Sequence, residues 1–253
     1  MIKVTLVSFT PDALTLLLKT KGTRLSSGDD PATWSEEKRQ EHLEYMRDTI
    51  KSSWEFVDYT FSIEGVTRAF THQLVRTRTG SYAQQAMRVI DARHSPVEMP
   101  PSMEMNDEAL EIWSDAVATV MHAYGELIDL GAPAQDARGI LPTNVTTNIM
   151  CKFNLRTLHD MAKLRLCTRT QGEYQNVFRA MRDEIVGVHP WADEFLQVHC
   201  VANGTCAFPR YGKVGCPVYF PELDNDAVKA KAYSRFWSLR YEAAPMAKDG
   251  KAM

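Results

Sequence analysis

The chain has 253 residues, 44% of them hydrophobic, which is enough to bury a core in one large domain or two small ones. Its 29 basic and 32 acidic residues leave a formal net charge of -3 without a block of like charge, which argues against a broad nucleic-acid or membrane-binding surface. No segment approaches the roughly 20 apolar residues that cross a bilayer, and residues 1–9 are too strand-like for a signal peptide, so we expect a cytoplasmic protein.

The first part of the chain predicts a strand followed by two helices. Residues 2–9 are rich in β-branched and apolar side chains, which favours a strand, and a short helix carrying Leu16–Leu18 follows. Gly22 and the run 26–31 indicate a loop. A helix begins after Ser35, a residue type that caps helices, and two glutamates lie in its first turn.

The next part alternates between extended and helical patterns. Residues 57–64 alternate apolar and polar side chains and form the clearest strand, which we expect Gly65 to end. Residues 66–75 return to a helical period. Residues 79–81 break that helix before a second extended stretch over residues 82–90.

Three helices are expected in the second half, at 107–130, 154–166 and 173–186. In the long helix six large side chains share one face: Leu110, Trp113, Val117, Val120, Met121 and Tyr124. There is no internal repeat and no low-complexity linker. We therefore predict one α+β domain over residues 1–253, with a mainly antiparallel sheet, several packed helices and a loop-rich, cysteine-containing tail over residues 199–253.

The unusual chemical feature is a set of arginines near predicted helix ends and loop edges. A guanidinium group binds phosphate through paired hydrogen bonds, so arginines that converge from separate segments are typical of a nucleotide site. A helical Arg–Asp pair four residues apart, such as Arg156 and Asp160, is more often a surface ion pair. The arginines are Arg76, Arg78, Arg88, Arg138, Arg156 and Arg165.

Residues 73–88 resemble the signature of the flavin-dependent thymidylate synthases. That signature has Arg-His-Arg, seven further residues, Ser, and Arg two positions later. The two flanking arginines and the final Arg88 match in register, whereas Thr77 stands for the histidine and Ala86 for the serine.

Three more segments resemble the same family in the same order. Residues 59–68 are similar to the lead-in to the signature, and residues 137–142 to the family's Ala-Arg-x-x-Leu-Pro element. Residues 154–166 are similar to its Asn-x-Arg-Ser-Leu and Leu-Arg stretch. The four elements span roughly residues 52 to 175, which makes coincidence a poor explanation.

The resemblance implies a fold, a reaction and a set of ligands. The expected protein is a homotetramer with FAD at subunit interfaces. It would transfer a one-carbon group from methylenetetrahydrofolate to C5 of a pyrimidine deoxynucleotide, dUMP to dTMP, with reduced flavin as the hydride source and NADPH as the external reductant.

The resemblance also assigns residues, position by position. Arg165 is implied as the catalytic residue, because a fixed cation beside the pyrimidine ring stabilises charge during attack at C5. Substrate binding is implied for Gln73, Arg76, Gln84, Gln85, Ala86, Met87, Arg88, Arg138 and Arg165. Cofactor binding is implied for Ser53, Arg76, Thr77, Arg78, Gln84, Asn154, Arg156 and Asp160.

Five positions depart from the usual family pattern: Thr77, Gln84, Ala86, Gln135 and Asp160. Exchanging a carboxylate for an amide and losing a hydroxyl change the hydrogen-bonding groups near the ring. A variant C5 methyl or hydroxymethyl transfer to dCMP or dUMP is therefore an alternative to dTMP formation. A non-catalytic flavin- or nucleotide-binding protein is an alternative of another class.

Two further candidates have ordinary structural interpretations. Cys200, Cys206 and Cys216, with His199, could hold zinc, but gaps of five and nine residues do not match the usual Cys-x-x-Cys spacing. We expect free thiols and no metal site. His72 could act as a base near neutral pH, although a helical histidine more often packs or hydrogen-bonds structurally.

Overall fold

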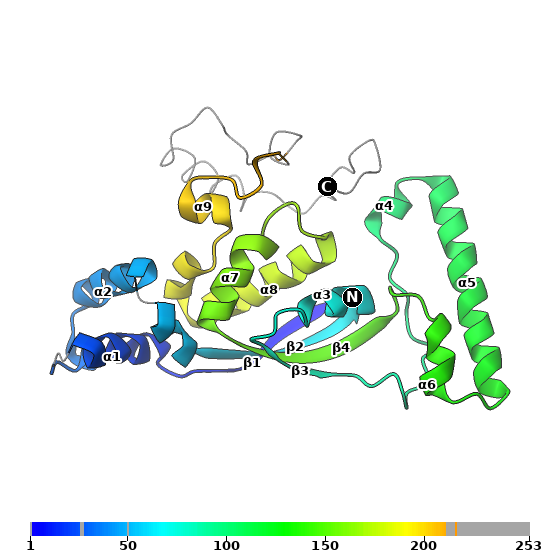
Figure 1. Ribbon diagram of the computed structural model, residues 1–253, viewed down its shortest axis with the longest axis horizontal. Coiled ribbons are helices and arrows are strands. Elements are labelled where there is room, and N and C mark those ends of the chain that lie inside the picture. The colour runs from blue at the N-terminus through cyan, green and yellow to red at the C-terminus, as the bar shows by residue number, and fades with distance from the viewer. Residues whose placement is uncertain (1, 26–27, 50, 211–215, 217–253) are drawn as a thin grey trace. The chain divides into compact units, whose positions relative to one another are not determined.

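A computed structural model describes residues 2–25, 28–49, 51–210 and 216 (Figure 1). Four strands form one sheet in the order β1-β2-β4-β3. The strands are β1 Lys3–Phe9, β2 Asp58–Thr67, β3 Ser81–Gln84 and β4 Thr146–Asn154.

The strands pair in antiparallel fashion. At one end of the β2–β4 pair the Leu155 amide donates to the Val57 carbonyl oxygen at 2.8 Å. Near the other end the Gly65 amide donates to Asn148 Oδ1 at 2.9 Å, so the two strands run in opposite directions. The predicted α+β class with a mainly antiparallel sheet is confirmed.

Helices make up most of the rest of the described chain. The α-helices are α1 Ala13–Leu25, α2 Glu36–Thr49, α3 Arg68–Leu74, α4 Pro101–Glu104, α5 Asp107–Asp129, α6 Ala134–Ala137, α7 Leu155–Arg165, α8 Gly172–Val188 and α9 His199–Asn203. Four short 3-10 helices are η1 Pro31–Thr33, η2 Lys51–Phe56, η3 Arg138–Ile140 and η4 Pro190–Phe195.

Side-chain caps explain where three of these helices begin. Thr67 Oγ1 accepts from the Phe70 amide at the start of α3, at 3.0 Å. Asn106 Oδ1 accepts from the Ala109 amide at the start of α5, at 3.1 Å, and Asn154 caps α7 in the same way. Each cap satisfies an amide that has no partner within the helix.

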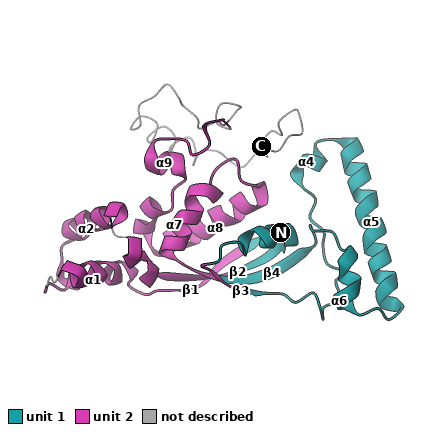
Figure 2. Ribbon diagram, viewed as in Figure 1, with its two compact units in different colours: residues 1–3, 62–78, 82–151 teal, residues 4–61, 79–81, 152–253 magenta. Residues whose placement is uncertain are grey.

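The chain divides into two compact units (Figure 2). Unit 1 comprises residues 1–3, 62–78 and 82–151, and unit 2 comprises residues 4–61, 79–81 and 152–253. Unit 1 contains a small core of Ala92, Tyr124 and Ala137. In unit 2 Trp54 is fully buried and its ring meets His159 and Phe195 edge-on. The single-domain boundary stays a prediction, and residues 211–215 and 217–253 of the expected tail lie outside the described residues.

Three local predictions were wrong. Gly22 lies buried inside α1, which continues to Leu25, so it does not begin a loop. Gly65 does not end its strand: its φ of 69° is accessible to glycine without strain, and β2 continues to Thr67. The second extended stretch is shorter than residues 82–90, because β3 ends at Gln84 and residues 87–89 form a turn.

Candidate active site

The turn after α3 in unit 1 carries the first two signature arginines. Its backbone is fixed by hydrogen bonds from the Arg76 amide to the Gln73 carbonyl oxygen at 3.2 Å and from the Thr77 amide to the Leu74 carbonyl oxygen at 3.0 Å. The Tyr82 hydroxyl donates to the Thr77 carbonyl oxygen at 2.6 Å. The turn therefore holds Arg76 on an ordered backbone.

The arginines of the signature are available for a ligand. Arg76, Arg78 and Arg88 are exposed, and none of them forms an ion pair with a carboxylate in the described part of the chain. Exposed cations without a protein counter-ion are suited to binding phosphate groups.

Gln84 at the end of β3 makes a specific contact. Its Nε2 donates to Thr71 Oγ1 at 2.8 Å, while the Thr71 hydroxyl donates to the Arg68 carbonyl oxygen at 3.1 Å. The Thr71 hydroxyl proton is already used in the bond to the Arg68 carbonyl. Thr71 Oγ1 can therefore only accept a hydrogen bond from residue 84. An amide fits this position, whereas a carboxylate has no proton to donate.

The segment after β3 leaves the sheet within two residues. The Gln85 amide donates to the Asn148 carbonyl oxygen at 3.0 Å, which adds one hydrogen bond to β4 after the end of β3. Ala86 is exposed, and Met87 packs on the small core of unit 1.

A cation that sequence reasoning missed lies near Arg138. Burial, and then the charge of Arg138, lower the pKa of Arg68, so two half-buried guanidinium groups of unit 1 lie close to each other. Arg138 Nε donates to the Gln135 carbonyl oxygen at 3.1 Å. Neither arginine forms an ion pair with a carboxylate of the described residues. Two like charges held together favour an anionic ligand.

In unit 2 the predicted cofactor residues lie on α7, at its N-cap at the end of β4, and on η2, which packs against α7. Asn154 accepts from the Thr157 amide at 2.9 Å, and Arg156 pairs with Glu55 of η2 at 2.5 Å. Asp160 is exposed one turn further along. The Ser53 hydroxyl is buried, and no described residue gives it a hydrogen-bond partner.

Arg165, at the C-terminal end of α7, is held by an aromatic ring. Its guanidinium lies 4.5 Å from the centroid of the buried Tyr174 ring of α8. A cation–π contact of this kind fixes the orientation of the side chain before any ligand binds.

Comparison with known proteins identifies the family. Residues 5–191 match the family described as thymidylate synthase complementing protein. The chain is 34% identical over 232 residues to a flavin-dependent thymidylate synthase of Sulfolobus acidocaldarius, covering 88% of this chain and 85% of that one. The chain belongs to the flavin-dependent thymidylate synthase family.

A second relative supports the same family, and a solved structure has a similar fold. A flavin-dependent thymidylate synthase of Pyrococcus abyssi is 35% identical over 235 residues, covering 85% of this chain and 93% of that one. A crystal structure of a UMP/dUMP methylase PolB from Streptomyces cacaoi, bound with 5-Br dUMP, has a TM-score of 0.65, with 18% identity, and covers 79% of this chain and 97% of that one. The likeness to PolB concerns the fold alone.

The flavin-dependent thymidylate synthase signature is thus present in a modified form. Thr77 contributes its backbone carbonyl to the Tyr82 contact, and Gln135 contributes its carbonyl to Arg138, so neither interaction depends on the replaced side chain. Gln84 is different, because its amide makes the contact to Thr71. His72 is exposed on α3 and stays an untested candidate.

The cysteines are free thiols in the part of the chain that the structure describes. Burial raises the pKa of Cys200 to about 12, and nearby Cys167 adds to the effect. The described residues contain no group of three or more His, Cys, Asp or Glu placed to hold a metal ion. The choice between zinc and thiols in the tail stays a prediction that metal analysis of the purified protein would decide. Among the described helices, none has the length and apolar character needed to cross a membrane.

Proposed function

We propose that this family member transfers a one-carbon group to C5 of dUMP and forms dTMP, with FAD, methylenetetrahydrofolate and NADPH. The observation that carries the proposal is the retention of the signature arginines Arg76, Arg78 and Arg88 in register, exposed and without carboxylate partners among the described residues. Relatives that align with more than four fifths of this chain are named flavin-dependent thymidylate synthases.

The residues fit a flavin dinucleotide. Among the described residues, Arg76 and Arg78 form no ion pair and can bind a diphosphate, and the buried Ser53 hydroxyl has no hydrogen-bond partner, which a ligand would provide. In this proposal Thr77, Gln84, Asn154, Arg156 and Asp160 are the other cofactor contacts. Bound FAD supplies the hydride.

The nucleotide is held by its phosphate and oriented by its ring. Arg88 and Arg138, with Gln73 and Arg76, bind the phosphate, and residues 84–87 line the ring and sugar. Arg165 lies beside the pyrimidine and stabilises the negative charge that develops during attack at C5. Its contact with Tyr174 supports this role, since a preorganised cation needs no reorientation during the reaction.

We also propose a cytoplasmic homotetramer in which residues 1–253 act as one domain. The long helix α5 supports assembly: of its 23 residues only Tyr124 is buried, and the other five large side chains of its predicted face are half-buried. Ile112 on the same helix is 64% exposed. Apolar surface of this extent is suited to burial against another subunit.

Purified protein tests the proposal in two steps. Its absorbance should show flavin bands, and incubation with dUMP, methylenetetrahydrofolate and NADPH should yield dTMP. Modification of dCMP at C5 without turnover of dUMP would sink this version and favour the alternative methyl or hydroxymethyl transfer. A yellow protein that binds nucleotide without turnover would favour the non-catalytic alternative.

A further inference from the structure

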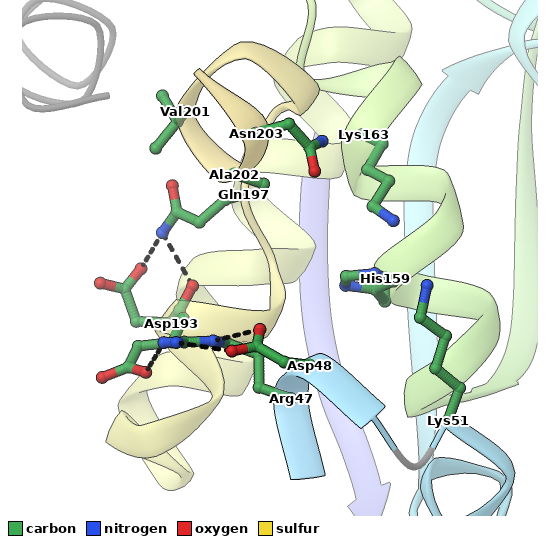
Figure 3. A pocket seen from close by; sticks show the side chains of 11 residues that line it. Arg47, Asp48, Lys51, His159, Lys163, Asp193, Gln197, Val201, Ala202 and Asn203 are labelled. Carbon is green, nitrogen blue, oxygen red and sulfur yellow. Dashed lines mark hydrogen bonds and ion pairs between the residues drawn. The ribbon is translucent and has the colours of Figure 1, made fainter. Parts of the chain in front are cut away.

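A cavity of about 670 Å³ opens in unit 2 among α2, η2, α7, η4 and α9 (Figure 3). Its volume lies within the roughly 300–1,000 Å³ of small-molecule sites. None of the residues proposed above to bind flavin or nucleotide lines it. The cavity is therefore separate from the proposed flavin and nucleotide contacts of unit 2.

The acidic groups of the cavity are already satisfied. Arg47 pairs with Glu194 at 2.6 Å and with Asp48 at 3.2 Å. Asp193 accepts from Arg182 and, at 2.8 Å, from Gln197 Nε2. These carboxylates consequently have protein partners of their own.

Two lysines on the other side have no such partner. Lys51 extends from η2 and Lys163 from α7, with their ammonium groups directed toward each other beside the His159 ring (Figure 3). Neither forms an ion pair with a carboxylate of the residues that the structure describes. Burial and then the charge of Lys51 lower the pKa of Lys163, and the opposing attraction of Asp160 is the weaker effect.

The histidine beside them adds no charge. His159 Nδ1 lies 2.7 Å from the Phe195 carbonyl oxygen, which can only accept, so Nδ1 carries the proton. Burial lowers the pKa of His159 to about 4, which leaves the ring neutral near pH 7. The local charge is therefore that of two ammonium groups that form no ion pair with a carboxylate of the described residues, and Asp160 offsets it only in part.

We propose that Lys51 and Lys163 bind a phosphate monoester group of a small molecule in this cavity. A phosphate monoester carries about -1.5 to -2 charge at pH 7 and three acceptor oxygens, so it balances both ammonium groups. A single carboxylate would leave one of the two positive charges uncompensated. Because the proposal concerns binding alone, it is independent of the dTMP-forming activity.

Calorimetric titration of the full chain with inorganic phosphate tests the proposal. FAD and dUMP are first added to saturation so that the arginine sites are filled, and sodium chloride holds the ionic strength constant. We expect one phosphate per chain. Lys51→Gln and Lys163→Gln should each weaken binding at least tenfold, while Lys163→Arg, which keeps the charge, should largely retain it.

Lys19→Gln is the matched control. It removes a lysine of unit 2 that is 54% exposed on α1 and pairs with Asp30 outside the cavity, so phosphate binding should not change. Competition with NADP⁺ and NAD⁺, which differ by one phosphate monoester, then separates two sources of the group. Displacement by NADP⁺ alone identifies a dinucleotide phosphate, and displacement by neither identifies free phosphate or another ester.

Three results would overturn the proposal: no saturable phosphate binding, equal affinity in the wild type and both glutamine variants, or, in a parallel titration without FAD, phosphate binding that is absent from the FAD-saturated protein. The last would make the cavity part of the flavin site. A chain that binds phosphate through these lysines but forms no dTMP would refute the proposed function and leave this inference standing.

Discussion

At the scale of single residues, Arg165 is the side chain on which the proposed chemistry most depends. Arg165→Lys keeps a charge but removes the planar guanidinium that faces the Tyr174 ring at 4.5 Å. We expect kcat to fall about 100-fold or more, as when one preorganised donor is lost, with little change in Tm. Arg24→Lys, on the exposed end of α1, is the control. An unchanged kcat would remove Arg165 from the catalytic role.

Gln84 offers a test of why an amide stands at this position. Gln84→Glu would place an acceptor against Thr71 Oγ1, whose proton already goes to the Arg68 carbonyl. We expect the free energy of unfolding to fall by about 1 kcal/mol, and hence a Tm lower by about 2–4 °C. In a Thr71→Val background, Gln84→Glu should cause no further loss of stability. Equal losses in both backgrounds would show that the contact is unimportant.

His159 should make stability depend on pH. Its pKa in the folded chain is about 4, against an ordinary value of 6.5, chiefly because it is buried. As pH falls, the unfolded chain therefore takes up the proton before the folded chain does. The contribution of neutral His159 to the free energy of unfolding is full above pH 6.5 and is lost as pH falls toward 4. At about 1.4 kcal/mol per pH unit, the loss is on the order of 3 kcal/mol.

Urea unfolding at several pH values measures this effect. His159→Asn keeps a donor toward the Phe195 carbonyl. It should reduce the slope of the unfolding free energy against pH between pH 6.5 and 4. His122→Asn, at an exposed position on α5, should leave the slope as in the wild type. A slope that survives in His159→Asn would assign the effect to other groups.

At the scale of elements, the cap of α7 separates structural from functional roles. Asn154→Ala removes the 2.9 Å bond to the Thr157 amide and should cost about 1 kcal/mol of stability as well as flavin affinity. Asn106→Ala removes the equivalent cap of α5 and should lower stability alone. Thermal unfolding and flavin titration measure the two effects. Equal flavin affinity in the two variants would make Asn154 purely structural.

Most of the described α-helices could be predicted from the sequence because their caps and periodicities are local. The α5 prediction, residues 107–130, differs from the observed helix by one residue at its end. The strand β4 escaped prediction although Thr147, Ile149, Cys151 and Phe153 alternate as buried residues. Met150, an apolar residue that is 47% exposed, conceals the alternation.

The site was predictable where a motif is contiguous and not where contacts join distant segments. Arg76, Arg78 and Arg88 could be identified from their register alone. The pairing of Arg68 with Arg138, and of Lys51 with Lys163, is not part of any one motif, because each pair is formed only when the chain folds. Sequence spacing does not encode such pairs.

At the scale of the whole molecule, the apolar face of α5 should govern assembly. Val120→Asp places a charge on that half-buried face, whereas Thr119→Asp places it on the exposed opposite side. We expect light scattering to give a tetramer for the wild type and Thr119→Asp, and a smaller species for Val120→Asp. A tetramer in all three would place the subunit contacts elsewhere.

The backbone passes from one compact unit to the other after residues 3, 61, 78, 81 and 151. No single break in the chain can therefore leave each unit intact on its own fragment. A cut after residue 151 would keep the whole of unit 1 on one fragment but would divide unit 2, so recombination at a single point cannot exchange one unit and leave the other complete.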